Sequence, residues 1–258
     1  MAESDGLTDE IVSNKWLEIA SAIEGVVARI QDPDDFIVQT SSELAGDDAC
    51  SSPYHLSHCA RWCLNAGVDH LHALKTLVID SSVIHSSADY SLARGALENF
   101  GAGFWLLHPP DRRIRVERAM RWWAKNFKDQ SRATKGMPNE TPLAPKLDKL
   151  VDIARAADCD LKRIRDGYTS SEALQYADQY SLARRPYLIW QVCSGFAHGR
   201  PWANIGMNAM EKRSTADEGV SLVRLTTDYK RLLGIAWPAT RLMEDFLRLY
   251  QDRAKQAP

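Results

Sequence analysis

Along most of this chain the hydrophobic positions recur at the spacing of an α-helix. Large apolar residues near the N-terminus predict a helix over about residues 7–30: Ile11, Trp16, Ile19, Ile23, Val26 and Ile30. Asp32-Pro33 ends this helix, and the small, polar residues of 33–52 predict a loop with at most one short turn. Ser52-Pro53 then favours a second helix with the proline at its first position.

Further helices follow from the same signals. Capping residues, prolines and apolar spacing predict them over about residues 86–108, 111–135, 145–157, 170–180 and 186–198. The pattern changes over 202–227, where apolar side chains such as Ile205 and Met207 alternate with polar or glycine positions around a polar turn. This alternation predicts a β-hairpin. A last long helix is expected after Thr227 or Asp228.

These elements predict a mostly α protein, a multi-helix bundle with one β-hairpin before the C-terminal helix. We expect a single helical domain over 1–258. Within it, residues 1–52 would form the N-terminal helix and polar loop, and residues 53–258 the main bundle with the hairpin at about 202–227. The composition fits, because 45% hydrophobic residues in a chain of 258 can build a sizeable core.

Charge and cysteine content exclude several classes of protein. The net charge of -2 gives no overall attraction to nucleic acid, so any such binding must come from a local patch. Five cysteines without a secretion signal argue against a disulfide framework. The acidic start MAESDGLTDE does not fit a signal peptide, and the longest uncharged apolar run, 100–107, is too short to cross a bilayer. We therefore expect a cytoplasmic protein without a membrane partner.

The strongest charge pattern lies on the predicted helix over 111–135. Nine basic and three acidic residues there give a local excess of +6. Eight of the cations are three or four residues apart and share one side of the helix: Arg112, Arg115, Arg118, Arg121, Lys125, Lys128, Arg132 and Lys135. Such a stripe predicts phosphate binding, with Arg118, Arg121 and Lys125 as ligand contacts. The alternative is a solvated helix face whose acidic partners lie elsewhere in the chain.

A second constellation lies on the predicted helix over 86–108. Arg94 and Glu98 are four residues apart and can pair, and Tyr90 precedes them by one turn. Three glycines in the same helix indicate the close approach of other helices: Gly95, Gly101 and Gly103. We therefore expect a mostly buried pair that faces the helix of His198. Arg94 and Glu98 are either catalytic groups beside a ligand-binding Tyr90 or an internal ion pair that fixes helix register.

A third constellation lies near the end of another predicted helix. Gln191, Ser194 and His198 are three and four residues apart on one face. Arg200 and Trp202 follow, and they add a cation and a flat aromatic surface suited to an anionic or stacking ligand. His198, Ser194 and Arg200 are therefore candidate catalytic residues, and Gln191 and Trp202 are candidate ligand contacts. The alternative is a helix C-cap made by His198 and the glycine after it.

A metal site has weaker support in the sequence. His55 and Cys59 are four residues apart on a predicted helix and could share an ion. However, no CxxC motif occurs, and no glutamate is followed three residues later by a histidine. A glycine-rich phosphate loop, a nucleophile elbow and a Walker motif are absent as well. We expect no metal and no cofactor.

Two short motifs carry a family resemblance: Arg94-x-x-x-Glu98 and Ser194-x-x-x-His198-Gly199. With the hairpin and closing helix that follow, they resemble uncharacterised HEPN-like helical proteins of bacteria from about residue 53 to the C-terminus. The resemblance implies a helical bundle that is often dimeric, and an RNase of toxin or phage-defence systems. Active members use an arginine four to six residues before a histidine. No arginine stands at that distance before His198, so Arg94 or Arg200 would have to supply it in space.

The leading hypothesis is therefore a HEPN-like protein that binds RNA or another phosphate-bearing ligand. This hypothesis has two forms, one in which the ligand is only bound and one in which it is also cleaved. The expected partner is a second copy of the chain in a homo-oligomer. One alternative is a non-catalytic homo-oligomeric interaction module. Another is an enzyme with a small-molecule pocket between the Arg94 and His198 helices. The first hypothesis predicts anion binding along 111–135, the second predicts a large apolar interface, and the third predicts an enclosed cavity.

Overall fold

The computed structural model describes residues 8–138, 140–215 and 217–255. Within them the helices are α1 Asp9–Gln31, α2 Glu43–Ser51, α3 Leu56–Lys75 with a π-helical turn Thr76–Asp80, α4 Ala88–Leu107, α5 Arg112–Ala133, α6 Leu143–Ala156, α7 Ser170–Tyr180, α8 Pro186–Ala197, α9 Pro201–Met207 and α10 Tyr229–Ala254. The strands β1 Ala209–Ser214 and β2 Ser221–Thr226 form one antiparallel hairpin directly before α10. The predicted fold class is confirmed. Leu7, at the start of the predicted first helix, and Ala216, within the predicted turn of the hairpin, lie outside the described residues.

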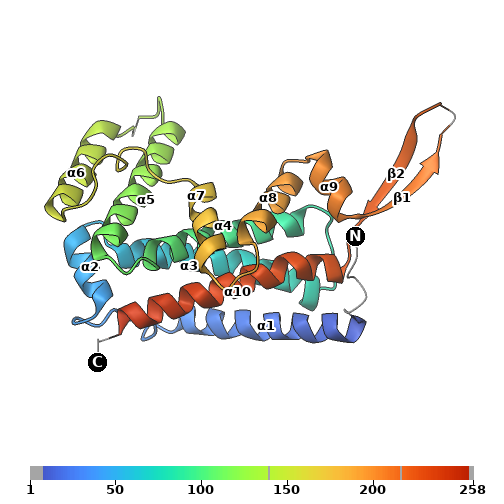
Figure 1. Cartoon of the computed structure of the whole chain (residues 1–258), viewed down its shortest axis with the longest axis horizontal. Helices are drawn as coiled ribbons and strands as arrows, with labels where there is room; N and C mark the ends of the chain where they lie inside the picture. Colours follow the sequence, from blue (N-terminus) through green and yellow to red (C-terminus); the bar gives the residue numbers. More distant parts are fainter. Residues whose placement is uncertain (1–7, 139, 216, 256–258) are drawn as a thin grey trace.

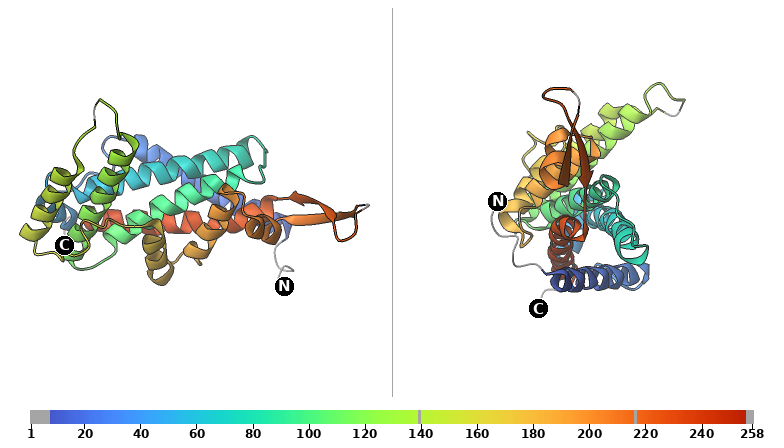
Figure 2. Two further views of the ribbon diagram at one scale, coloured as in Figure 1. Left: turned by 90° about the horizontal axis from the view of Figure 1, so that it is seen from above. Right: turned by 90° about the vertical axis from the view of Figure 1, so that its right-hand side faces the viewer.

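The long helices α1, α3, α4 and α10 run side by side along the molecule, and each packs against at least two of the others (Figure 1). Helices α5 and α6 form one end of the molecule, and the hairpin extends from the other end (Figure 2). Helices α7 and α8 pack on α4, and α9 packs on α8. This arrangement leaves α8 and α9 at the hairpin end, with α4 behind α8.

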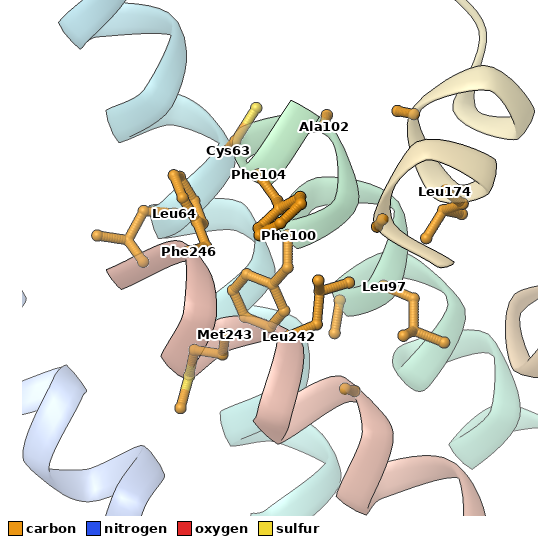
Figure 3. Close-up of a cluster of buried hydrophobic side chains, with 14 of the residues drawn as sticks. Cys63, Leu64, Leu97, Phe100, Ala102, Phe104, Leu174, Leu242, Met243 and Phe246 are labelled. Atoms are coloured by element: carbon orange, nitrogen blue, oxygen red, sulfur yellow. The ribbon is translucent and has the colours of Figure 1, made fainter. Parts of the chain in front are cut away.

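The core lies where α3, α4, α7 and α10 meet, and Figure 3 shows side chains from all four helices pointing toward one another. Phe100 of α4 and Phe246 of α10 are completely buried there. Glycines make these contacts possible, since a Cβ on Gly103 would overlap the Phe246 ring and one on Gly101 would overlap Leu174. Gly95 meets the ring of His70 on α3 in the same way. The predicted close approach of other helices at these three glycines is confirmed.

The predicted loop over 33–52 is wrong in its second half, which forms helix α2. Ser42 caps it by accepting a hydrogen bond from the Ala45 amide at 3.1 Å. The buried face of α2 consists of Leu44, Asp47 and Ser51, so two of its three inward side chains are polar. Hydrophobic periodicity cannot reveal such a helix.

The predicted proline start of the second helix is also wrong. Helix α3 begins at Leu56, and Pro53 lies before it after a cis Ser52–Pro53 peptide bond. The first turn of α3 is capped from α2, because the Ser51 hydroxyl accepts from the Leu56 amide at 3.2 Å and Asp48 accepts from the Ser57 amide at 2.9 Å. Side chains of α2 therefore cap the N-terminus of α3.

The first part of the predicted hairpin is helical. Residues Pro201–Met207 form α9, and the strands begin only at Ala209. Pro201 is at the first helical position, where its missing N–H costs nothing. Only Ala203 is buried, and it packs against Gly195 of α8. The apparent alternation came from a short helix with a single inward residue.

Candidate functional site

A pocket of about 440 Å³ lies between α7, α8 and α9. Its wall contains all five residues predicted in the third constellation: Gln191, Ser194, His198, Arg200 and Trp202. Tyr187, Trp190 and Gly195 of α8 and Ser171 of α7 complete it. Helix α4 contributes no lining residue, so the pocket is not the predicted one between the Arg94 and His198 helices.

The turn between α8 and α9 brings Arg200 and Trp202 to this pocket. Helix α8 ends at Ala197, and Gly199 adopts a left-handed conformation with φ of 62°. The Arg200 amide then donates to the Gly195 carbonyl at 2.8 Å, which turns the chain back toward α8. Gly195 has no side chain at the point where Trp202 packs, so the indole can lie against the helix. Gly199 thus ends helix α8 and also turns the chain so that Arg200 and Trp202 reach the pocket.

The pocket has a positive and aromatic character. Arg200 and His198 are exposed, and neither has an acidic partner among the described residues. The Trp202 indole is 57% exposed, which is unusual for so large an apolar group. Trp190 and Tyr187 are half-buried, with their rings stacked 5.9 Å apart. A cation beside aromatic faces suits an anionic ligand that carries a flat ring.

The Arg94–Glu98 pair supports the pocket from α4. Arg94 Nη2 lies 3.0 Å from Glu98 Oε1, and the Trp190 indole donates to the same carboxylate oxygen at 2.8 Å. The pair faces α8 as predicted. Its side chains are 29% and 28% exposed, so most of each is buried, as predicted, although neither is sealed from solvent. Among described side-chain atoms, Arg94 Nε is buried and has no hydrogen-bond partner.

Tyr90 lies in the core behind the pocket. Its ring stacks on Phe196 of α8 with centroids 3.6 Å apart, and its hydroxyl is 3.3 Å from Thr227 Oγ1. The side chain is fully buried, and burial raises the pKa of its phenol. Cys193 beside it is also buried, which raises the pKa of that thiol above its usual range. Tyr90 thus fixes α8 against α4, and it does not line the pocket.

The three candidate phosphate contacts of α5 are engaged within the protein. Arg121 is 2% exposed, donates to the Gly167 carbonyl at 2.9 Å and pairs with Glu172. Arg118 stacks over the Tyr176 ring at 4.1 Å, and burial lowers the pKa of its guanidinium. Lys125 pairs with Asp129. Arg118 and Arg121 are therefore engaged by other parts of the fold, whereas Lys125 belongs to an exposed pair within α5.

The expectation that the α5 cations share one outward face is wrong. Arg115, like Arg121, is buried. Its Nε and Nη2 atoms lie 2.7 and 2.9 Å from the carboxylate of Asp47, which is fully buried in α2. Arg115 also donates to the carbonyls of Pro109 and Pro110. The charge excess of this helix is therefore largely neutralised by partners that pack against it.

Four lining residues of the pocket were not predicted from the sequence: Ser171, Tyr187, Trp190 and Gly195. Trp190 precedes Ser194 by four residues and Tyr187 precedes Gln191 by four, so both belong to the polar face already identified. That spacing could have revealed them. Ser171 comes from α7, and nothing in the sequence places it near α8.

Neither a membrane-spanning helix nor a metal centre is found in the described part of the chain. No helix there is both long and apolar enough to cross a bilayer. No group of three or more histidine, cysteine or acidic side chains in the same residues is arranged to hold an ion. The rings of His55 and His58 contact each other at a tilt of 34°, with centroids 4.9 Å apart.

Comparisons with known proteins give no indication of function. No protein-family model, no curated protein and no solved structure matches the chain. The resemblance to HEPN-like proteins therefore stays a prediction. What can be argued about function comes from the pocket of α8 and α9 and from the groups behind it.

Proposed function

We propose that this chain is a HEPN-like helical protein that binds single-stranded RNA, or another phosphate-bearing ligand with a flat ring, in the pocket of α8 and α9. The observation that carries the proposal is Arg200, an exposed guanidinium without an acidic partner in the described residues, in one pocket with the Trp202 indole. Arginine binds phosphate through two parallel hydrogen bonds, and an exposed indole stacks on a base.

The size and charge of the pocket favour one nucleotide unit over a long duplex. A volume of about 440 Å³ falls within the range of small-ligand sites. The net charge of -2 gives no general attraction to a polyanion. Since Arg200 would neutralise one phosphate, the logarithm of affinity should fall with the logarithm of salt concentration with a slope of only about -0.7. A stripe of many free cations would give a far steeper slope.

The same pocket supports a cleavage step. His198 would accept the proton of a ribose 2′-hydroxyl, and the 2′-oxygen would then attack the adjacent phosphorus. The bond from phosphorus to the 5′-oxygen breaks, and that oxygen takes up a proton from solvent. Arg200 would stabilise the charge that develops on the phosphoryl oxygens. Ser194 and Gln191 line the pocket and would orient the ribose.

Binding is tested by the fluorescence anisotropy of a labelled single-stranded oligoribonucleotide at low salt. Arg200→Glu and Trp202→Ala should each weaken binding by about tenfold or more, because each removes a ligand contact. Arg155→Glu is the matched control, since Arg155 is an exposed arginine of α6 outside the pocket. Absence of binding by the wild-type protein would refute the proposal, as would equal binding by the Arg200 variant.

Cleavage is tested separately on the same oligonucleotide. His198→Ala should abolish cleavage and leave binding within about twofold of the wild type, because Arg200 and Trp202 remain. An all-deoxy oligonucleotide should bind and stay intact, since it lacks the attacking hydroxyl. Cleavage by the His198 variant at the wild-type rate would exclude this role for the histidine and leave the binding proposal standing.

Homo-oligomer formation has its own support in the hairpin. A two-stranded hairpin is marginally stable by itself in water. Nevertheless Met210, Leu222 and Val223 are 40%, 63% and 41% exposed on strands that extend from the helical body (Figure 2). Met210 and Val223 share one face of the hairpin, and Leu222 lies on the opposite face. We propose that the face of Met210 and Val223 packs against a second copy of the chain. Analytical ultracentrifugation should find a dimer that Val223→Glu dissociates, and a wild-type monomer at high concentration would refute it.

A further inference from the structure

A second groove lies on the other side of α8 from the pocket described above. It has a volume of about 440 Å³ and runs between α8, α10 and α1, which follow one another from top to bottom in Figure 1. Its apolar surface comes from Ile11 of α1, Leu188 and Ile189 of α8, and Leu233 and Trp237 of α10. Ile11 and Leu188 remain 40% and 43% exposed, so the groove is an open apolar surface.

Gly234 of α10 keeps the middle of this groove open. A Cβ added there would meet no atom within 4 Å, in contrast to Gly103 of α4, whose Cβ would overlap Phe246. Packing therefore does not require a glycine at 234. An exposed helix-interior glycine costs about 1 kcal/mol relative to alanine. The space that Gly234 leaves is part of the groove, and any larger side chain would occupy it.

The rim of the groove is basic. Arg184 and Arg185 lie at the start of α8, and both are exposed with no acidic partner among the described residues. Lys15 of α1 lies 4.5 Å above the Trp237 ring but pairs with Glu18 at 2.6 Å, so the unpaired charge at the rim is that of the two arginines. No aspartate or glutamate lines the groove within the described residues. A ligand that fits must therefore carry negative charge at one end and apolar surface along the rest.

We propose that this groove binds a single-chain anionic amphiphile. Its aliphatic chain would lie over Gly234 between Leu233 and Trp237, and its anionic head would contact Arg184 and Arg185. The apolar floor disfavours a bare phosphate, because a phosphate gains nothing from apolar contact. The basic rim disfavours a cationic head group by like-charge repulsion. The volume lies within the range of small-ligand sites.

The direct test is isothermal titration calorimetry of the full chain with laurate below its micellar concentration. Laurate should bind, because it has both an aliphatic chain and a carboxylate. Acetate, which has only the head group, should bind at least about a hundredfold more weakly. Dodecyltrimethylammonium, with the same chain length and the opposite charge, should bind at least about tenfold more weakly. Equal binding of the cationic and anionic amphiphiles would overturn the role of the arginines.

Matched variants locate the site. Gly234→Leu should weaken laurate binding by about tenfold or more, because its side chain occupies the groove. Gly25→Leu is the control, since Gly25 is an exposed glycine within α1 whose Cβ would also meet no atom within 4 Å. The double variant Arg184→Glu/Arg185→Glu should weaken laurate binding by a similar factor. Arg132→Glu/Lys135→Glu is its control, since both are exposed cations at the C-terminal end of α5, outside the groove.

Several results would overturn the proposal. They are the absence of laurate binding, or binding that Gly234→Leu leaves unchanged while circular dichroism confirms its fold. A wild-type dimer that Gly234→Leu dissociates would overturn it too, because a second copy of the chain would then cover the groove. The RNA-binding pocket lies on the other side of α8, so loss of RNA binding in the Arg200 variant does not bear on these outcomes.

Discussion

The cations of α5 and the cation of the α8–α9 turn differ in what surrounds them. Helix α5 carries the denser charge, yet its Arg115 and Arg121 are buried against carboxylates and carbonyl oxygens. Arg200 stands almost alone in sequence, is exposed, and has no acidic partner in the described part of the chain. The sparser region is therefore the one whose charge is available to a ligand.

This difference has a simple physical basis. A buried guanidinium must be paired, because the desolvation of an unpaired charge costs several kcal/mol. Asp47 and Glu172 provide that pairing from α2 and α7, which fixes the position of α5 against the rest of the bundle. An exposed arginine pays no such cost and can exchange water for a ligand. Charge density along one helix therefore says little about binding until its partners are known.

The largest expected effect tests the structural role of the α5 cations. Asp47→Ala leaves the Arg115 guanidinium buried without its carboxylate. We expect the free energy of unfolding to fall by roughly 3 to 5 kcal/mol, as for other buried pairs that lose one partner. Urea denaturation followed by circular dichroism measures this loss.

The control for that experiment is an exposed pair of the same chemistry. Asp152 and Arg155 of α6 lie 2.6 Å apart, with side chains 71% and 61% exposed. Asp152→Ala should change stability by less than about 1 kcal/mol, because water screens the pair. If both aspartate variants lose the same amount, the contrast between buried and exposed cations is wrong.

The second prediction sets the two regions directly against each other. Arg121→Glu places a carboxylate beside Glu117 and Glu172, so we expect a loss of at least about 3 kcal/mol in unfolding free energy. Arg200→Glu should change stability by less than about 0.5 kcal/mol, since surface substitutions usually do. Thermal denaturation and RNA anisotropy on the same preparations separate the two effects.

Charge reversal along α5 is therefore a poor test of nucleic-acid binding. A variant with Arg118, Arg121 and Lys125 all changed to glutamate would lose buried contacts as well as charge. The milder Lys125→Glu, which affects an exposed pair with Asp129, should leave RNA binding unchanged. A folded Lys125→Glu variant that no longer binds RNA would indicate that α5 contacts the phosphate groups.

The long helices could be predicted from the sequence because their apolar positions keep helical spacing. Helix α7 has the predicted bounds, and α4 and α5 differ from theirs by about two residues at either end. Helix α2 could not be predicted, since Asp47 and Ser51 face inward. The buried carboxylate of Asp47 is paired with Arg115, which is distant in sequence. The buried hydroxyl of Ser51 accepts from the first turn of α3, which belongs to the next helix. Local patterns do not contain such information.

The candidate site could be predicted in part, for similar reasons. Gln191, Ser194 and His198 share one face of α8, which spacing alone reveals. The turn at Gly199 that returns Trp202 to the same pocket follows from a glycine with positive φ, a common helix ending. By contrast, the partners of Arg118 and Arg121 come from α4, α7 and the loop before α7. Sequence spacing cannot identify partners that only the tertiary fold brings near.

The third prediction concerns the pair behind the pocket. Glu98→Ala removes the acceptor of the Trp190 indole and the partner of Arg94. Because both side chains of the pair are more than a quarter exposed, we expect a loss of only about 1 to 2 kcal/mol. RNA binding should weaken as well, since Trp190 is freed to move within the pocket wall. Urea denaturation and anisotropy measure the two effects, and a loss above about 3 kcal/mol would place the pair with the buried cations of α5.

The smallest expected effect decides between a cap and a site at His198. The residue occupies the C-cap position of α8, where a positive charge stabilises the helix end by about 0.3 to 1 kcal/mol. If capping is its only role, His198→Ala lowers stability by that amount and leaves RNA cleavage and binding intact. The proposed role predicts loss of cleavage with little change in stability. His198→Lys separates the two, because it places a positive charge at the helix end and removes the imidazole. We expect the lysine variant to match the wild type in urea denaturation and to lack cleavage activity. A lysine variant that cleaves RNA normally would show that only the charge matters, and the base would have to be another group.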